Sequence, residues 1–166
     1  MKHPRAPRPE VHAVQEFDCH EARRRILRHL YSPLMTTGFE RAYTGAPWES
    51  RYGYCRALRA GRLIFITGTT AVDPEGHVLS PGDAAGQARW CFRIIENALA
   101  QVRADRSCIT RVRMFVTDIS RSAEFAAAHR EFFDRHDPCL TMVEVSRLID
   151  PAMLVEIEAE GVASAD

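Results

Sequence analysis

Three glutamates near the C-terminus are the first candidates for chemistry. Glu156, Glu158 and Glu160 occupy alternate positions of an otherwise apolar, strand-like segment. Because successive side chains of a strand point to opposite faces, the three carboxylates share one face, about 7 Å apart from one to the next. Like charges in such a row repel unless solvent or a partner neutralises them. We interpret Glu158 and Glu160 as a solvated strand face, and Glu156, nearest the preceding Pro-containing turn, as the candidate for chemistry.

The elements that would position Glu156 follow a regular order from residue 50 onward. Hydrophobic periodicity predicts strands and helices at 54–60 (β), 63–67 (β), 83–104 (α), 110–117 (β), 121–136 (α), 140–147 (β) and 154–161 (β). We expect Asp83 or Ser80 to cap the first helix and Ser120 to cap the second. This β-β-α-β-α-β-β order predicts an α+β fold, with a mixed sheet and both helices on one of its faces.

The strand at 63–67 is apolar along its whole length, which is typical of a strand buried on both faces. Two helices on one face of the sheet leave the other face uncovered, and the sequence offers no further element to cover it. Because exposed apolar patches of that size are rare in monomers, we expect self-association through this face, with clefts between subunits.

Composition excludes several classes of function. The chain has 166 residues, 22 basic and 22 acidic, and a net charge of zero, so it has no overall attraction to nucleic acid or to an anionic membrane. No apolar run approaches the about 20 residues of a membrane-spanning helix, and the polar N-terminus does not resemble a signal peptide. The 5 cysteines form no C-x-x-C pair, which argues against a disulfide framework or a zinc site. We therefore expect a cytoplasmic protein without a metal.

The first 34 residues differ in character from the rest. They are rich in arginine, and Pro4, Pro7 and Pro9 argue against regular structure at the start. The spacing of apolar residues over 20–31 permits a short helix. We therefore divide the chain into a basic N-terminal extension, residues 1–34, partly disordered or a short helix, and a domain over residues 35–166.

Several short motifs follow one another in a characteristic order along this domain. Tyr54 precedes the first strand, an apolar segment runs from Gly61 to Gly68, and Val-Glu-Ile-Glu-Ala at 155–159 closes the order. These motifs resemble those of the Rid family, the YjgF-like reactive intermediate deaminases, over residues 48–162. The resemblance implies a chorismate-mutase-like fold, a homotrimer whose sheets form a central barrel, and pockets for small molecules at the subunit interfaces.

The best-known members of that family hydrolyse 2-imino acids, or their enamine tautomers, to 2-keto acids and ammonia without a cofactor. By resemblance, Glu156 matches the glutamate of the E-I-E-A motif and Tyr54 matches the pocket tyrosine. Thr67 and Gly68 match the first two residues of the S-G-Q segment, in which Thr69 replaces the glutamine. The resemblance therefore implies catalytic roles for Glu156 and Tyr54, and substrate binding by Thr67, Gly68 and Thr69.

One departure from the family pattern bears on the substrate. Leu140 occupies the position of the arginine that grips the substrate carboxylate, and Met142 stands where deaminating members often have cysteine. A leucine cannot make a charge-assisted bidentate pair with a carboxylate, and losing a hydrogen bond to a charged group costs about 1.5–3 kcal/mol. The chain therefore resembles the subgroups that lack this arginine. We expect the wall of Leu140 and Met142 to favour an apolar or neutral ligand.

Another arginine can replace the missing one if it points into the same cleft. Arg113 is the favoured candidate because it interrupts an otherwise apolar strand, and Arg56 and Arg147 are the alternatives. For each of them, a solvated position on the surface is the commoner outcome.

Together with these residues, the resemblance implies a cofactor-independent homotrimer that hydrolyses or tautomerises an imine- or enamine-type metabolite. Glu156 would orient or deprotonate a water, and backbone N–H groups near Thr141 and Met142 would polarise an oxygen of the substrate. The alternative is a ligand-binding or regulatory trimer without turnover. Zero net charge and the lack of interleaved aromatic and basic residues argue against an endoribonuclease. Chorismate mutase chemistry requires several arginines facing a dicarboxylate, and the sequence identifies none.

Overall fold

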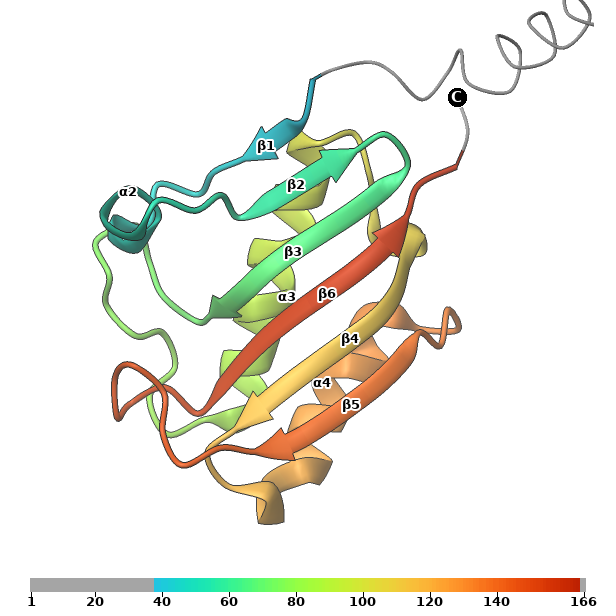
Figure 1. Cartoon of the computed structure of the whole chain (residues 1–166). Coiled ribbons are helices and arrows are strands. Elements are labelled where there is room, and N and C mark those ends of the chain that lie inside the picture. The colour runs from blue at the N-terminus through green and yellow to red at the C-terminus, as the bar shows by residue number, and fades with distance from the viewer. Residues whose placement is uncertain (1–37, 165–166) are drawn as a thin grey trace, which may run out of the picture. The chain divides into compact units, whose positions relative to one another are not determined.

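A six-stranded sheet with two long helices on one face organises the protein (Figure 1). The computed structural model describes residues 38–164, so the predicted extension at 1–34 lies outside the described residues. The elements are β1 (Glu40–Ala42), α2 (Pro47–Tyr52), β2 (Ala57–Ala60), β3 (Leu63–Thr70), α3 (Ala84–Gln101), β4 (Ile109–Val116), α4 (Ser122–Phe133), β5 (Cys139–Glu144) and β6 (Val155–Val162), with short 3-10 helices η1 (Arg106–Cys108) and η2 (Ile119–Arg121).

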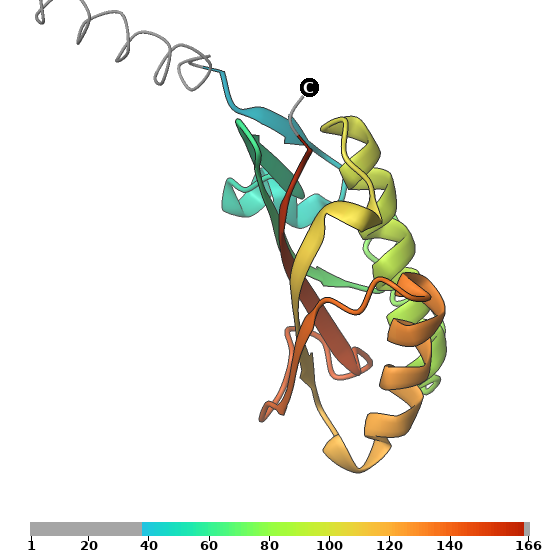
Figure 2. The same cartoon turned by 90° about the vertical axis from the view of Figure 1, so that its right-hand side faces the viewer.

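The strands lie in the order β1-β2-β3-β6-β4-β5. Every neighbouring pair is antiparallel except β4 and β5, which are parallel because α4 returns the chain across the sheet between them. Figure 2 shows α3 and α4 on the same side of the sheet. The predicted α+β fold, with a mixed sheet and both helices on one face, is therefore confirmed.

The hydrophobic core fills the space between the sheet and the two helices. Alternate residues of the strands point into it because a strand sends successive side chains to opposite faces. The helices contribute apolar residues at three- and four-residue spacing, as an amphipathic helix does. Fully buried members include Ile64, Val112, Ile157, Phe92 and Phe125. None of the helices within residues 38–164 is long and apolar enough to span a membrane.

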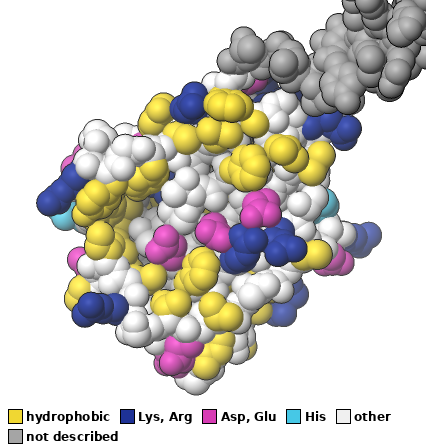
Figure 3. Space-filling view, in the orientation of Figure 1, with side chains coloured by type: hydrophobic (Ala, Val, Ile, Leu, Met, Phe, Trp, Pro, Cys, Tyr) yellow, Lys and Arg dark blue, Asp and Glu magenta, His cyan; other side chains and the backbone are white. Residues whose placement is uncertain are grey.

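Among residues 38–164, no long helix covers the opposite face of the sheet, called here the open face. Leu63 and Phe65 of β3 are 50% and 44% exposed on it, while Ile64 and Ile66, which alternate with them along the strand, are buried. In one protomer, this strand is therefore buried on one face only. Figure 3 shows hydrophobic side chains gathered on the open face, with acidic and basic side chains near its middle. An apolar surface of this kind is typical of an interaction site.

Several boundaries differ from the sequence-based expectations. The short β1 and α2 were not expected, and β2 begins at Ala57 rather than at residue 54. Asp83 caps α3 as predicted, because its side chain accepts a hydrogen bond from Gly86 N. Ser120 does not cap α4, because it lies inside η2, where Asp118 accepts a hydrogen bond from the Ser120 N–H. The strand expected at 140–147 is corrected to Cys139–Glu144.

Candidate functional site

A buried ion pair lies behind Tyr54. Arg56 and Glu49 are 4% and 5% exposed, and Arg56 Nε lies 3.2 Å from Glu49 Oε1. The Glu49 carboxylate also accepts hydrogen bonds from Thr44 N, Thr44 Oγ1 and Gly45 N, so the start of α2 is tied to the end of β1. Because an isolated buried charge is expensive, each partner of the pair depends on the other.

Arg56 joins Tyr54 to the segment that follows Thr67. Its Nη1 donates to the Gly68 carbonyl oxygen at 2.7 Å and to Thr69 Oγ1 at 3.2 Å. Its Nη2 donates to Tyr54 Oη at 3.2 Å, and the guanidinium lies over the Tyr54 ring, 5.3 Å from its centroid. The Arg56 side chain therefore links the Tyr54 hydroxyl to the backbone of β3. The sequence offered one signal for this role, the closeness of Arg56 to Tyr54 along the chain.

The carboxylate of Glu156 lies against Gly68. The register of β3 and β6 shifts between Ile66 and Thr69, so the regular pairing is interrupted at this glycine. A Cβ at position 68 would lie 1.9 Å from Glu156 Oε1, which no real contact allows. Any larger residue at this position would therefore displace the Glu156 carboxylate from where it lies.

Burial raises the pKa of Glu156 above its usual range, and the charge of Glu158 adds to the rise. The positive charge of Arg56 acts in the opposite direction and lowers this pKa. A carboxyl group with a raised pKa is a stronger base when ionised, which suits it to take a proton from water. Glu156 thus has the electrostatic environment expected of a general base.

A cavity of about 650 Å³, called here the open-face cavity, lies beside Tyr54. This volume lies within the range of small-molecule sites. The Thr67 hydroxyl donates to the Cys55 carbonyl oxygen at 2.8 Å, so the Thr67 oxygen remains available as an acceptor. The residues that line the cavity come from β1, α2, β2 and β3 and include Arg41, Glu49, Ser50, Tyr54, Leu58, Phe65 and Thr67.

The structure brings one group of predicted site residues together. Tyr54 and Thr67 line the open-face cavity, and Arg56 connects Tyr54 to the Gly68 backbone, against which Glu156 lies. Thr69 is 1% exposed and donates to the Thr67 carbonyl oxygen, so it supports this segment from behind rather than lining the cavity.

A second group of predicted residues lies elsewhere in the protomer. Leu140, Thr141 and Met142 belong to β5, the edge strand, which β4 and β6 separate from β3. Three strand spacings correspond to roughly 14 Å. Leu140 is 41% exposed at this edge. Within one protomer, these residues are therefore not brought to Tyr54 and Glu156.

Arg113 is occupied by the acidic row. Its Nη1 lies 2.6 Å from Glu158 Oε1 and 3.0 Å from Glu160 Oε1, and these hydrogen bonds raise the pKa of Arg113. Glu158 and Glu160, which we expected to be solvated, therefore share Arg113 of the neighbouring strand β4 as their ion-pair partner. In this arrangement, Arg113 does not offer its charge to a substrate carboxylate.

Arg41 is a residue of the open-face cavity that the sequence did not reveal. It lies on β1 beside Leu58 of β2, and its Nη1 donates to the Phe39 carbonyl oxygen at 3.4 Å. No periodic pattern predicts a strand of only three residues, so its position depends on tertiary structure.

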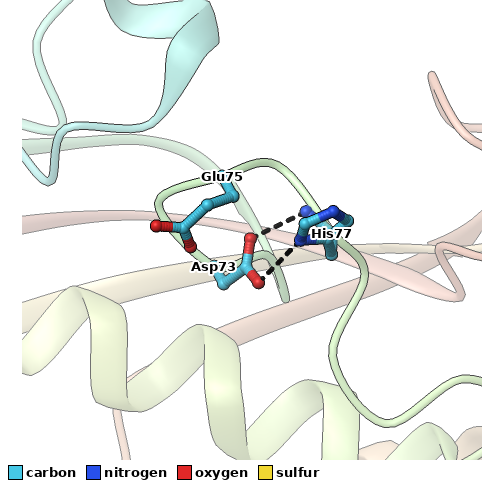
Figure 4. A group of neighbouring side chains, drawn as sticks. All are labelled: Asp73, Glu75 and His77. Carbon is cyan, nitrogen blue, oxygen red and sulfur yellow. Dashed lines mark hydrogen bonds and ion pairs between the residues drawn. The ribbon is translucent and has the colours of Figure 1, made fainter.

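A turn after β3 gathers three potential metal ligands (Figure 4). The ligand atoms of Asp73, Glu75 and His77 lie within 4.8 Å of one another. Asp73 accepts hydrogen bonds from the His77 backbone N–H at 2.8 Å and pairs with His77 Nδ1 at 3.0 Å. The Asp73 backbone N–H also donates to the His77 carbonyl oxygen, so these contacts close a turn over residues 73–77. The arrangement is explained by the turn itself.

Comparison with known proteins assigns the chain to a protein family. Residues 44–163 match the sequence profile of the family described as Endoribonuclease L-PSP. The chain belongs to this family. Its members include the YjgF-like proteins, so the predicted resemblance to the Rid family is confirmed.

Similar proteins of the Endoribonuclease L-PSP family come from several bacteria. An uncharacterized protein of Streptomyces coelicolor is 31% identical over 121 residues, which cover 72% of this chain and 89% of that protein. The putative reactive intermediate deaminase TdcF of Escherichia coli is 29% identical over 115 residues, 68% of this chain and 88% of TdcF. The crystal structure of Rv2704 from Mycobacterium tuberculosis, of the YjgF/YER057c/UK114 family, is 40% identical with a TM-score of 0.69 and covers 76% of this chain and 100% of that chain.

A buried glutamine of α3 anchors the loop that precedes β6. Gln87 is fully buried; its Nε2 donates to the Ala152 carbonyl oxygen at 2.8 Å, and its Oε1 accepts from Leu154 N at 2.8 Å. These two bonds attach the loop before β6 to the helix. Gln87 therefore fixes the point from which Glu156 enters the sheet.

Proposed function

We propose that this protein is a self-associating, cofactor-independent enzyme of the Rid type that hydrolyses or tautomerises an imine- or enamine-type metabolite. The observation that carries the proposal is the Glu156 carboxylate, with its raised pKa, set against Gly68 beside the Arg56–Tyr54 pair. The similarity to TdcF, named as a putative reactive intermediate deaminase, supports the same class of reaction.

In the proposed hydrolysis, Glu156 accepts a proton from water while the water oxygen bonds to the imine carbon. The resulting carbinolamine loses its nitrogen when the C–N bond breaks and the C=O bond forms. The Glu156 carboxyl first returns its proton to the nitrogen, which gives the neutral carbinolamine. The ionised carboxylate then passes the hydroxyl proton of the carbinolamine to the same nitrogen as the C–N bond breaks, so the products are a carbonyl compound and ammonia. Tyr54, held by Arg56 Nη2, would orient the substrate in the open-face cavity.

We further propose that the complete site forms between copies of the chain, arranged as a homotrimer. The open face exposes Leu63 and Phe65, which a second copy would bury. Leu140 is exposed on an edge strand, far from Tyr54 in its own protomer, whereas Met142 packs against the core of its own protomer. Leu140 would join the site by lining the Tyr54 side of a neighbouring subunit.

The proposed substrate lacks a carboxylate next to the imine. Leu140 replaces the arginine that grips this group in the best-known family members, and Arg113 is engaged by Glu158 and Glu160. The same two facts favour a second candidate, a trimer that binds a neutral metabolite without turnover. Loss of turnover in a Glu156 variant separates the enzyme from this binding protein.

RNA cleavage is not the function that this site supports. Within residues 38–164, no histidine or lysine lines the open-face cavity, so it lacks the usual pairs of groups for general acid–base cleavage of RNA.

An assay of ammonia release tests the proposal. The substrates are freshly generated 2-iminobutanoate and its methyl ester, in which the negative charge is absent. We expect the wild type to prefer the ester and Leu140→Arg to gain activity on the acid. Glu156→Gln should lose about 10²–10⁴-fold on either substrate, because the general base is removed. Preference of the wild type for the acid would refute the neutral substrate, and full activity of Glu156→Gln would refute the proposed catalytic role.

A further inference from the structure

A second cavity, of about 470 Å³, lies on the helix side of the sheet. Its walls come from α3, from the loop after β3 and from the segment between β1 and α2, and we call it the helix-side cavity. Its volume is in the range of small-molecule sites. Self-association through the open face would leave this side of the protein uncovered, so the cavity would remain accessible in an assembly.

The helix-side cavity is mainly apolar. Val72 and Leu79 of the loop and Trp90 and Ile94 of α3 supply its apolar walls. The Arg93 guanidinium lies over the Trp90 ring, 4.6 Å from its centroid, and this contact restrains the ring. A rigid aromatic wall of this kind suits a ligand with a ring.

Two polar groups in the lining have unused hydrogen-bonding capacity. Four of the five N–H donors of Arg56 are used by Glu49, Gly68, Thr69 and Tyr54; the fifth, on Nη2, has no acceptor among residues 38–164. Arg56 is only 4% exposed, and a buried donor of this kind calls for an acceptor.

The other group is the Asn97 side-chain amide. It makes no hydrogen bond with the residues that the structure describes, and it lies at the exposed side of the cavity. An amide both donates and accepts, so Asn97 accommodates either kind of polar atom on a ligand.

Charge in the lining selects against an anion. The charge of Arg56 is already balanced by Glu49, and Asp73 adds a carboxylate to the same lining. A ligand carboxylate would therefore meet no uncompensated positive charge there and would lose its hydration. A neutral acceptor can take the free N–H of Arg56 without this cost.

We propose that the helix-side cavity binds a neutral, largely apolar ring compound that presents an oxygen or nitrogen acceptor to Arg56 and hydrogen-bonds to the Asn97 amide. This site is distinct from the open-face cavity, and the proposal does not depend on the proposed enzymatic activity. Arg56 is the residue that links the two, since it lines one cavity and holds Tyr54 in the other.

Calorimetric titration of the full chain tests the proposal with two matched probes, 2-naphthol and 2-naphthoate, which share a ring system and differ in charge. We expect 2-naphthol to bind once per chain and 2-naphthoate at least tenfold more weakly. Ile94→Trp fills the helix-side cavity from a half-buried position and should weaken 2-naphthol binding at least tenfold. The matched control Ser50→Trp places the same side chain in the open-face cavity and should leave binding unchanged.

Asn97→Leu provides a second variant at an exposed helix position that tolerates substitution. It should weaken 2-naphthol binding about two- to tenfold, as expected for one hydrogen bond. Trp48 and Trp90 are the 2 tryptophans of the chain, so Trp90 emission can be isolated in a Trp48→Phe background and should change on binding. Absent binding, equal affinity for both probes, unchanged Trp90 emission, or a loss in Ser50→Trp instead of Ile94→Trp would each overturn the proposal.

Discussion

At the scale of single residues, Glu156 differs from the other two glutamates of its row because of its surroundings. Glu158 and Glu160 are paired with Arg113, whereas Glu156 lies half-buried against Gly68 at an irregular point of the β3–β6 ladder. Burial raises its pKa, and the nearby Arg56 limits this rise. Three identical side chains on one strand face therefore acquire two different roles, one structural and one suited to catalysis.

Gly68→Ala tests the close approach of Glu156. The added methyl group would force the Glu156 carboxylate aside, because a Cβ there lies 1.9 Å from its Oε1. The far end of a flexible side chain can move, so we expect kcat to fall at least tenfold while the urea midpoint changes little. Gly38→Ala is the matched control, since a Cβ at Gly38 meets nothing within 4 Å. Equal activity of the two variants would contradict the proposed position of the carboxylate.

The pH profile of kcat/KM tests the raised pKa of Glu156. Only the ionised carboxylate can act as a base, so activity should fall as pH decreases through a pKa above the usual 4.5. Burial is the main cause of the rise and Glu158 a smaller one, so Glu158→Gln should move this acidic limb to lower pH. A limb that stays in place or moves upward in Glu158→Gln would show that another group controls it.

At the scale of elements, the short helix α2 is held to the sheet by a buried charge. Glu49 of α2 pairs with Arg56, which in turn holds the β3 backbone at Gly68 and the Tyr54 hydroxyl. Loss of this ion pair should therefore affect both the stability of the fold and the site, because Glu49 and Tyr54 both line the open-face cavity.

Glu49→Ala should lower the free energy of unfolding by about 3–5 kcal/mol, because it leaves the Arg56 charge buried without its partner. Urea unfolding measures this loss. Glu131→Ala is the control, since it removes an exposed ion pair with Arg89 of similar length, 2.8 Å. An exposed pair contributes about 0–1 kcal/mol, so equal effects of the two variants would contradict the importance of burial.

The contact between α3 and α4 contains a buried histidine. His129 packs against the rings of Phe92 and Phe133, and its Nε2 has no hydrogen-bond partner among the described residues. Burial lowers the pKa of His129 below its usual 6.5. The unfolded chain then binds a proton at higher pH than the folded chain, so stability should decline as pH falls below 6.5.

His129→Phe should remove this part of the pH dependence. Urea unfolding at neutral and at mildly acidic pH should show a smaller loss of stability in the variant than in the wild type. An identical loss in both proteins would assign the pH dependence to other groups.

At the scale of the whole molecule, the open face is an apolar surface that a single protomer leaves exposed. Leu63, Phe65, Val143 and Val162 are between 42% and 50% exposed on strands of the sheet. The predicted wall at Leu140 and the open-face cavity lie at different places on the same protomer. Self-association would bury the apolar residues and also bring the two parts of the site together.

Phe65→Asp should prevent assembly, because it would bury an unpaired charge between subunits. Sedimentation velocity should show a trimer for the wild type and a monomer for the variant. Ala123→Asp introduces the same charge at an exposed position of α4, on the helix side, and should leave the trimer intact. A monomeric wild type would refute the proposed interface site, whereas dissociation of Ala123→Asp would place the interface on the other face.

The sequence by itself determined the order of the long elements, the helices on one face and the apolar strand at 63–67, because hydrophobic periodicity follows directly from helix and strand geometry. It also placed Tyr54, Thr67 and Glu156 in one family pattern. Tertiary structure alone decided that Arg56 connects Tyr54 to Gly68, that Arg113 is neutralised by Glu158 and Glu160, and that Arg41 reaches the cavity. Such pairings join residues distant in the chain, and their choice of partner depends on strand order and register, which local patterns do not encode.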